Sequence, residues 1–276
     1  MWTTRYVLRD IDDTIAEIKH YIDEYGIKSI QLYDLTAITK KRWIVDFCNR
    51  LISEDINLKW SVPQGTRSET LDQETLSLLK KTGCHYLVYA PESGDEETLK
   101  VIKKRIKLPR LISSIKIAKK VGLTLRVNLI IGFPTETRKN IYRTMLFGLK
   151  MALIGVDEVS VNIFSPYPGS ELFADLHSDG VVSLDDNYFL SLAKLNSDYF
   201  SLAPTTVISG VSSKELAAYR IFTLLAGYTL GYLSRPYRIV RTLRTIFSDG
   251  GAHTVLEQRL RDFIRLRKIK NSLSTN

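Results

Sequence analysis

Hydrophobic and polar positions in the first two thirds of the chain follow a helical period and a strand period in turn. The spacing of Ile11, Ile15 and Ile18 predicts a helix over residues 11–25, which Gly26 ends. The short apolar run behind it predicts a strand, and the same unit then repeats. The predicted strands are 29–33, 58–62, 86–89, 123–131 and 159–164, and the further helices are 42–51, 72–81, one or two up to 121, and 139–153.

Five predicted strands alternate with helices at a spacing of roughly thirty residues. This pattern predicts right-handed βαβ crossovers and a parallel α/β sheet. The later segments are an irregular connection with a short helix at 184–211, a helical segment at 213–247 interrupted at Pro236, and a helix at 254–269. We therefore expect a barrel-like part at 1–180 and a helical C-terminal extension at 181–276.

Composition is that of an ordinary globular protein, with 44% hydrophobic and 25% charged residues, and only the charge changes the picture. The net charge is +9. Residues 212–276 hold twelve Lys or Arg against four Asp or Glu, so this segment accounts for +8 of the net charge. We expect no specific nucleic-acid partner for this basic tail and favour its packing against the barrel. The alternative is contact with a membrane surface through a row of arginines that includes Arg235, Arg238 and Arg241.

The cysteines and the N-terminus give no sign of a metal site or of export. Cys48 and Cys84 lack metal-ligand spacing and are expected to be small buried residues in a reducing compartment. The four histidines show no ligand spacing either. Residues 1–6 lack the apolar core of a signal peptide, and the uncharged stretch 221–233 is too short to span a bilayer. A cytoplasmic location is expected.

Two strand-to-helix junctions carry the candidate chemistry. Residues 129–137 pass from an apolar run through Gly and Pro to Glu136, and residues 86–94 reach Glu92 between small neighbours. Because parallel strands end at one edge of a sheet, both carboxylates are expected on the rim where α/β barrels bind ligands. Glu136 has an equally good structural explanation, since a carboxylate near a helix N-terminus is stabilised by the helix dipole.

Three further polar residues are expected at the same rim. Asp34 ends the first predicted strand, and Gln64 and Arg67 lie in a predicted loop after the second. An arginine suits a carboxylate ligand because its planar guanidinium makes paired hydrogen bonds, although a surface pair with Glu69 explains Arg67 equally well. The sequence shows no nucleophilic triad, phosphate-binding glycine loop or zinc motif.

At these residues the sequence resembles the radical S-adenosylmethionine (SAM) enzymes, and within them the class that carries a cobalamin-binding domain ahead of the barrel. The resemblance covers about residues 1–180 and rests on an ordered set of segments at family spacing. The segments are 27–34, 59–61 with Gln64 and Arg67, 83–94, 130–136 and 165–169. The resemblance implies a partial (β/α)6 barrel of the TIM type that lacks its first strand, followed by the α-helical C-terminal extension.

The resemblance also implies cofactors and the residues that hold them. Residues around Glu92 would contact the methionine or ribose part of SAM, and residues 130–136 would flank the adenine. The implied contacts are Asp34, Gln64, Arg67, Glu92, Ser93, Gly94, Ile130, Gly132, Pro134 and Glu136. In such enzymes a 4Fe-4S cluster on three cysteines cleaves SAM to a 5′-deoxyadenosyl radical, and some members transfer a methyl group through methylcobalamin.

The chain departs from the family at the cluster, because the three-cysteine motif belongs on a loop after the first barrel strand and neither is present. We expect a fragment of a longer protein, inactive by itself, whose cluster loop and any cobalamin domain lie upstream. The full enzyme would need an electron donor and would act on a small-molecule, lipid or tetrapyrrole-type substrate that the sequence does not specify. The alternatives are a catalytically silent binding module and a peripheral membrane-associated scaffold.

Overall fold

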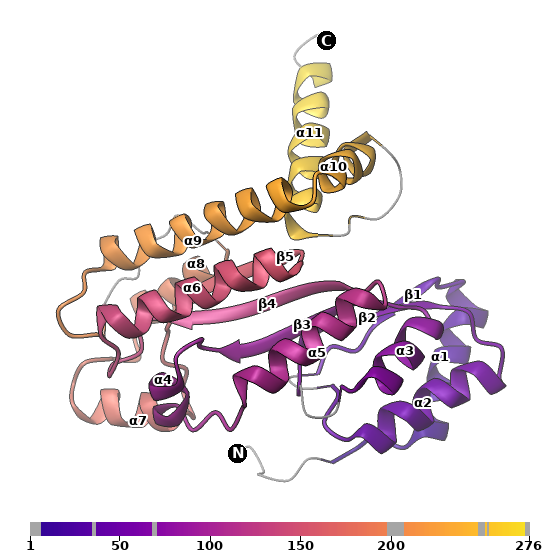
Figure 1. The fold of residues 1–276 in the computed structure, drawn as a ribbon, viewed down its shortest axis with the longest axis horizontal. Helices are drawn as coiled ribbons and strands as arrows, with labels where there is room; N and C mark the ends of the chain where they lie inside the picture. The colour runs from indigo at the N-terminus through magenta and orange to yellow at the C-terminus, as the bar shows by residue number, and fades with distance from the viewer. Residues whose placement is uncertain are drawn as a thin grey trace.

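Five parallel strands form a sheet in the described part of the chain, and their order follows the sequence, β1-β2-β3-β4-β5 (Figure 1). The computed structural model describes residues 7–34, 37–67, 71–197, 207–247, 252 and 254–273. The strands are β1 (Ser29–Gln31), β2 (Lys59–Thr66), β3 (Cys84–Glu92), β4 (Thr124–Ile131) and β5 (Glu158–Ile163). Each connection carries a helix, as parallel neighbours require. The predicted α/β fold, a partial barrel, is confirmed.

Eleven helices are assigned within the same ranges. They are α1 (Ile11–Tyr25), α2 (Lys41–Ser53), α3 (Gln73–Lys81), α4 (Glu96–Val101), α5 (Leu108–Lys120), α6 (Arg138–Ile154), α7 (Glu171–Ser178), α8 (Asp186–Ser197), α9 (Ser213–Ser234), α10 (Tyr237–Phe247) and α11 (Val255–Leu273). The interruption predicted at Pro236 separates α9 from α10. Helix α7, which Ser170 caps through the amide of Phe173, was not predicted.

One face of the sheet packs on helices and is almost wholly apolar. The ring of Trp60 in β2 makes an edge contact with the ring of Phe47 in α2. The hydroxyl of Tyr89 in β3 lies 2.9 Å from the hydroxyl of Ser114 in α5. In β4 every second residue is buried on this face, from Leu125 to Ile131. The other residues of β4 are half-buried and belong to the opposite face, which is the inner face of the partial barrel.

Helix α9 covers the outer face of β5 beside α6. Gly148 of α6 lies so close to Val159 and Thr223 that an added Cβ would come within 3.1 and 3.5 Å of them. The basic tail therefore begins with a helix packed on the sheet, as the favoured interpretation expected. The division at residue 180 stays a prediction. None of the helices in the described ranges has the length and apolar composition needed to cross a bilayer.

Buried charges join the last two helices to the amino edge of the sheet. The Asp157 side chain is 1% exposed, accepts hydrogen bonds from Lys119 at 2.5 Å and Arg241 at 3.0 Å, and lies 3.3 Å from Arg238. Arg241 also donates to the buried Glu257 of α11 at 3.0 Å. Burial alone would raise the pKa of Asp157, but Lys119 and Arg238 outweigh it and the pKa is lowered.

Candidate functional site

The carboxyl edge of the sheet gathers the ends of all five strands. Asp34 follows β1 and is exposed, Arg67 follows β2 and is exposed, and Glu92 is the last residue of β3. Ile130, near the end of β4, belongs to the half-buried inner face. Since the strands are parallel, these four positions lie at one edge, as predicted.

Gln64 and Gly65 lie inside β2, so the loop predicted there is wrong. The strand shifts register between Val62 and Thr66, and Gly65 has φ +133, a backbone conformation that side chains rarely adopt. This bulge lets β2 continue to Thr66, whose hydroxyl donates to the carbonyl of Val88 at 3.2 Å. Gln64 is consequently a half-buried strand residue next to the edge.

Glu92 combines an unusual backbone with a partly open carboxylate. Its φ is +71, which is rare for a residue other than glycine, and the register of β3 shifts just before it. Lys104, in the connection from α4 to α5, donates to the carboxylate at 3.0 Å, and 24% of the side chain stays exposed. Glu92 is thus held at the edge by one cation and keeps room to accept further hydrogen bonds.

Ser93 and Gly94 fasten the end of β3 to helix α6. The Ser93 hydroxyl is buried and lies 2.8 Å from the hydroxyl of Thr144, which also accepts the Gly94 amide at 3.2 Å. A Cβ at position 94 would come within 2.2 Å of the Cβ of Phe147. These contacts explain both residues structurally, because they fix the direction in which Glu92 leaves the strand.

Glu136 holds its own loop together. One carboxylate oxygen accepts the amides of Gly132 at 2.7 Å and Phe133 at 3.0 Å, and the other accepts the Thr98 hydroxyl at 3.2 Å. The side chain is buried, and burial raises the pKa of Glu136 despite these bonds. The structure supports the structural explanation of Glu136, and the loop it shapes brings Gly132 and Pro134 to the end of β4.

The inner face of the sheet carries a polar network that the sequence analysis missed. Arg126 donates to the side chains of Asn128 at 2.8 Å and Ser160 at 3.0 Å, and Tyr86 donates to Glu158 at 3.1 Å. The sequence carries a signal for this network, because polar and apolar residues alternate over 124–129 within the strand predicted at 123–131. Burial raises the pKa of Tyr86, so its hydroxyl stays a donor.

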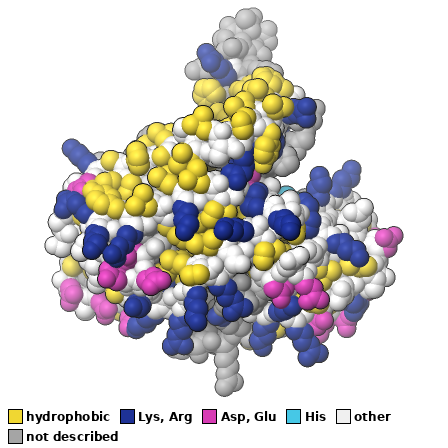
Figure 2. Space-filling model, in the orientation of Figure 1, with side chains coloured by type: hydrophobic (Ala, Val, Ile, Leu, Met, Phe, Trp, Pro, Cys, Tyr) yellow, Lys and Arg dark blue, Asp and Glu magenta, His cyan; other side chains and the backbone are white. Residues whose placement is uncertain are grey.

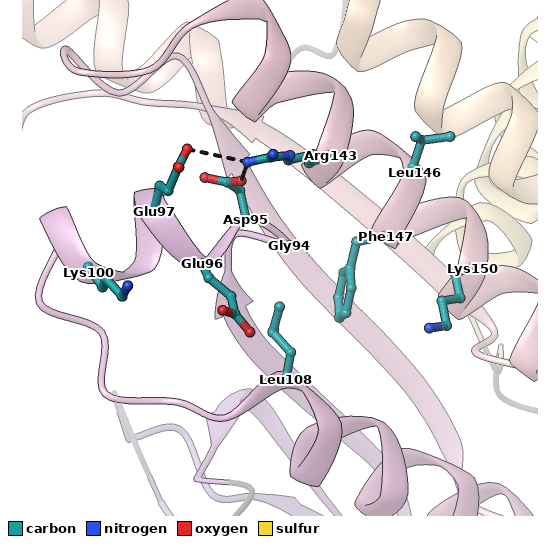
Figure 3. A pocket seen from close by; sticks show the side chains of 10 residues that line it. All are labelled: Gly94, Asp95, Glu96, Glu97, Lys100, Leu108, Arg143, Leu146, Phe147 and Lys150. Atoms are coloured by element: carbon teal, nitrogen blue, oxygen red, sulfur yellow. Dashed lines mark hydrogen bonds and ion pairs between the residues drawn. The ribbon is translucent and has the colours of Figure 1, made fainter.

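A cavity of about 630 Å³, which we call the outer cavity, lies on the helix side of the sheet between α4, α5 and α6 (Figure 3). Its lining comprises Gly94, Asp95, Glu96, Glu97, Lys100, Leu108, Arg143, Leu146, Phe147 and Lys150. Asp95 accepts hydrogen bonds from Arg143 at 2.9 Å and Asn140 at 2.8 Å, so its charge is balanced within the protein. This cavity is separate from the inner face that Ile130 and Arg126 line.

The geometry so far defines a partial α/β barrel with polar side chains on its inner face and at its carboxyl edge. A family comparison gives the class, because the Radical SAM superfamily matches residues 2–148, more than half of the sequence. The chain belongs to the radical SAM superfamily.

The chain is similar in sequence to two curated methyltransferase relatives. It is 33% identical over 172 residues to the uncharacterized methyltransferase PH0819 of Pyrococcus horikoshii, covering 62% of this chain and 36% of that protein. It is 28% identical over 194 residues to cytidylyl-2-hydroxyethylphosphonate methyltransferase of Streptomyces wedmorensis, covering 68% and 36%. The chain therefore spans little more than a third of the length of either relative.

A solved structure shares the fold. The radical SAM methyltransferase TsrM of Kitasatospora setae, determined with cobalamin and a [4Fe-4S] cluster bound, has a TM-score of 0.53 with 14% sequence identity. The match covers 64% of this chain and 35% of TsrM. The family match confirms the resemblance to the radical SAM enzymes, and the solved structure adds that the fold is shared.

The residues of this chain do not fit a cluster held by three cysteines. The sequence has two cysteines, Cys48 on α2 and Cys84 at the start of β3, and both are buried and free. Burial raises the pKa of Cys48 to about 11, which disfavours the thiolate that ligates iron. Within the described residues no group of His, Cys, Asp and Glu is placed to hold a metal ion.

Proposed function

We propose that the carboxyl edge of the sheet is the SAM site of a radical methyl-transferring enzyme and that these 276 residues contribute cofactor binding to it. The observation that carries the proposal is the convergence of Gln64, Glu92 and Ile130 at one edge, with loops fixed from behind by Ser93 and Glu136. The methyltransferase relatives support methyl transfer as the reaction class. The substrate is left open.

Each edge residue has a part that its chemistry suits. The partly exposed Glu92 carboxylate accepts hydrogen bonds from the SAM ammonium or ribose hydroxyls. Ile130 offers an apolar surface to the adenine, and Gly132, with φ +91, lets the backbone approach it closely. Gln64, Asp34 and Arg67 supply polar groups at the neighbouring strand ends. The chain's work is to bind and orient the cofactor and to keep water out.

SAM binding to the full 276-residue chain, measured by isothermal titration calorimetry, tests the site. Glu92→Gln is expected to lower the affinity at least about tenfold, since a hydrogen bond to a charged group contributes about 1.5–3 kcal/mol. Glu96→Gln is the matched control, because Glu96 lies four residues on, exposed, beside the outer cavity. Equal affinity of Glu92→Gln and the unchanged chain would show that the edge is not the SAM site.

The second candidate is a binding module without radical chemistry, and the two buried cysteines favour it for the chain alone. Iron and sulfide are measured after anaerobic reconstitution of the same chain. We expect fewer than four irons per chain, and the same SAM affinity before and after reconstitution. A full complement of four irons per chain would overturn the proposal that these residues are inactive alone.

A further inference from the structure

Helix α10 is inverted relative to an ordinary surface helix. Its exposed hydrophobic side chains are Tyr237, Ile239, Val240, Leu243 and Phe247. Its buried side chains are Arg238, Thr242 and Thr245. Leu243 is 51% exposed and Phe247 is 77% exposed, whereas Arg238 is 2% exposed. A surface helix normally turns its apolar stripe to the core. Helix α10 instead exposes its apolar stripe, which is unfavourable if only water contacts it.

Buried hydrogen bonds fix this orientation. Arg238 donates to the carbonyl oxygens of Gly155 at 2.7 Å and Val156 at 3.1 Å. Thr242 donates to the buried carboxylate of Glu257 at 3.0 Å. Turning the apolar stripe inward would leave these charged groups without partners inside the protein, which is strongly unfavourable. The outward apolar stripe is therefore the stable arrangement of α10.

The stripe continues over the neighbouring helices. The exposed apolar residues of α9 are Phe222, Leu225 and Leu233, and those of α6 are Tyr142, Leu146 and Leu153. Tyr142 and Tyr219 join the two helices through an edge-on ring contact. Figure 2 shows hydrophobic side chains gathered along α9 and α10, with Lys and Arg side chains beside them. We call this surface of α6, α9 and α10 the apolar face; along α9 it is on the order of 30 Å long.

The apolar face is basic and poor in acid. Helices α6 and α10 contain no Asp or Glu, and they carry Lys139, Lys150 and Arg244 in exposed positions. The acidic residue of α9, Glu215, is paired with Arg138 at 2.6 Å. Two copies meeting through this face would bring like charges together, which opposes a symmetric dimer. Exposed apolar side chains among cations instead match an anionic lipid surface.

We propose that the apolar face docks the protein on an anionic phospholipid surface, with Leu243 and Phe247 between the acyl chains and Arg244 at the headgroup phosphates. The contact is peripheral, because no described helix is fit to cross a bilayer. The family match ends at residue 148, so α9 and α10 lie outside it. The residues of the apolar face are not among those of the proposed SAM site at the carboxyl edge.

Flotation of the full chain with vesicles tests the proposal, using phosphatidylcholine alone and phosphatidylcholine mixed with phosphatidylglycerol. The unchanged chain is expected to float with the mixed vesicles and much less with phosphatidylcholine. Leu243→Asp is expected to lower the partition coefficient at least about tenfold. Arg244→Glu should lower it about fivefold or more on mixed vesicles and leave phosphatidylcholine binding unchanged.

Ile52→Asp is the matched control, because Ile52 is 43% exposed on α2, beside the other end of the sheet. It should float like the unchanged chain. Thermal melting checks that each variant is folded. The proposal is overturned if the chain stays with the soluble fraction on mixed vesicles, or if Leu243→Asp floats undiminished. It is also overturned if light scattering shows a dimer that Leu243→Asp dissociates while vesicles bind neither form.

Discussion

The carboxylates at the two edges of the sheet differ in burial and in the number of cations around them. At the amino edge, Asp157 is 1% exposed and meets Lys119, Arg238 and Arg241. At the carboxyl edge, Glu92 meets Lys104 on a strained backbone and stays 24% exposed. At the amino edge the charged side chains join α10 and α11 to the sheet. At the carboxyl edge the Glu92 carboxylate can still accept hydrogen bonds from a ligand. This is the division between stability and function expected of α/β barrels.

Replacing the amino-edge carboxylate is expected to have the largest effect on stability. Asp157→Asn should lower the free energy of unfolding by about 3–5 kcal/mol, because it leaves the buried Arg238 without its ion pair. Urea denaturation measures the change, with Asp175→Asn on the exposed side of α7 as control. A loss below about 1 kcal/mol would mean that the amino edge does not hold the C-terminal helices.

The pH dependence of the two edges should have opposite signs. The lowered pKa of Asp157 gives stability that is present above its unfolded pKa of about 4 and is lost as pH falls through the folded pKa. The raised pKa of Glu136 gives a contribution that is present at low pH and is lost as pH rises through the folded pKa. The stability difference between the unchanged chain and Asp157→Asn should therefore shrink from pH 6 to pH 3.

Urea denaturation at both pH values checks this, with Glu136→Gln as the comparison. For Glu136→Gln, the stability advantage of the unchanged chain should be greater at pH 3. Differences that move in the same direction for both variants would contradict the assignment of the two edges.

Gly94→Ala should come next in size. Its Cβ would lie 2.2 Å from the Cβ of Phe147, which is not the movable end of a side chain, so β3 or α6 must shift. Overpacking of this kind costs about 1–3 kcal/mol, and the shift should also lower SAM affinity by displacing Glu92. Gly227→Ala, where an added Cβ would meet Val159 at an ordinary contact distance of 3.8 Å, controls for adding a methyl group without overpacking. Equal losses for the two variants would refute the packing argument.

Tyr86→Phe should have the smallest effect. It removes one hydrogen bond to Glu158, which keeps the hydroxyl of Tyr228 at 3.3 Å and the amide of Val255 at 2.5 Å. The expected loss is about 0.5–1.5 kcal/mol by thermal or urea denaturation. A loss as large as that of Asp157→Asn would place the inner polar network among the main stabilising features.

Periodicity was enough to predict most of the fold. The helix predicted over 11–25 has the same bounds as α1, because Asp10 and Gly26, with φ +59, supply both caps locally. The extent of β2 could not be predicted, because it depends on a bulge and on pairing between Thr66 and Tyr89 of another strand. Helix α7 was missed for a different reason, since its eight residues carry too short a pattern.

The site was predictable to the level of the edge but not of the contacts. Parallel strands made it certain that residues after each strand would share one side. Whether a carboxylate there faces a ligand or its own loop depends on partners distant in sequence, as Thr98 for Glu136 and Lys104 for Glu92 show. The inner network of Arg126 and Ser160 likewise needs the register of β4 on β5.

Hydrogen–deuterium exchange of the full chain with and without saturating SAM tests the central claim most directly. We predict slower exchange of amides in residues 92–94 and 130–134 at the carboxyl edge. Amides in residues 155–158 at the amino edge should exchange at the same rate in both samples. Slowing confined to the amino edge, or no slowing at the carboxyl edge under saturation, would contradict the account.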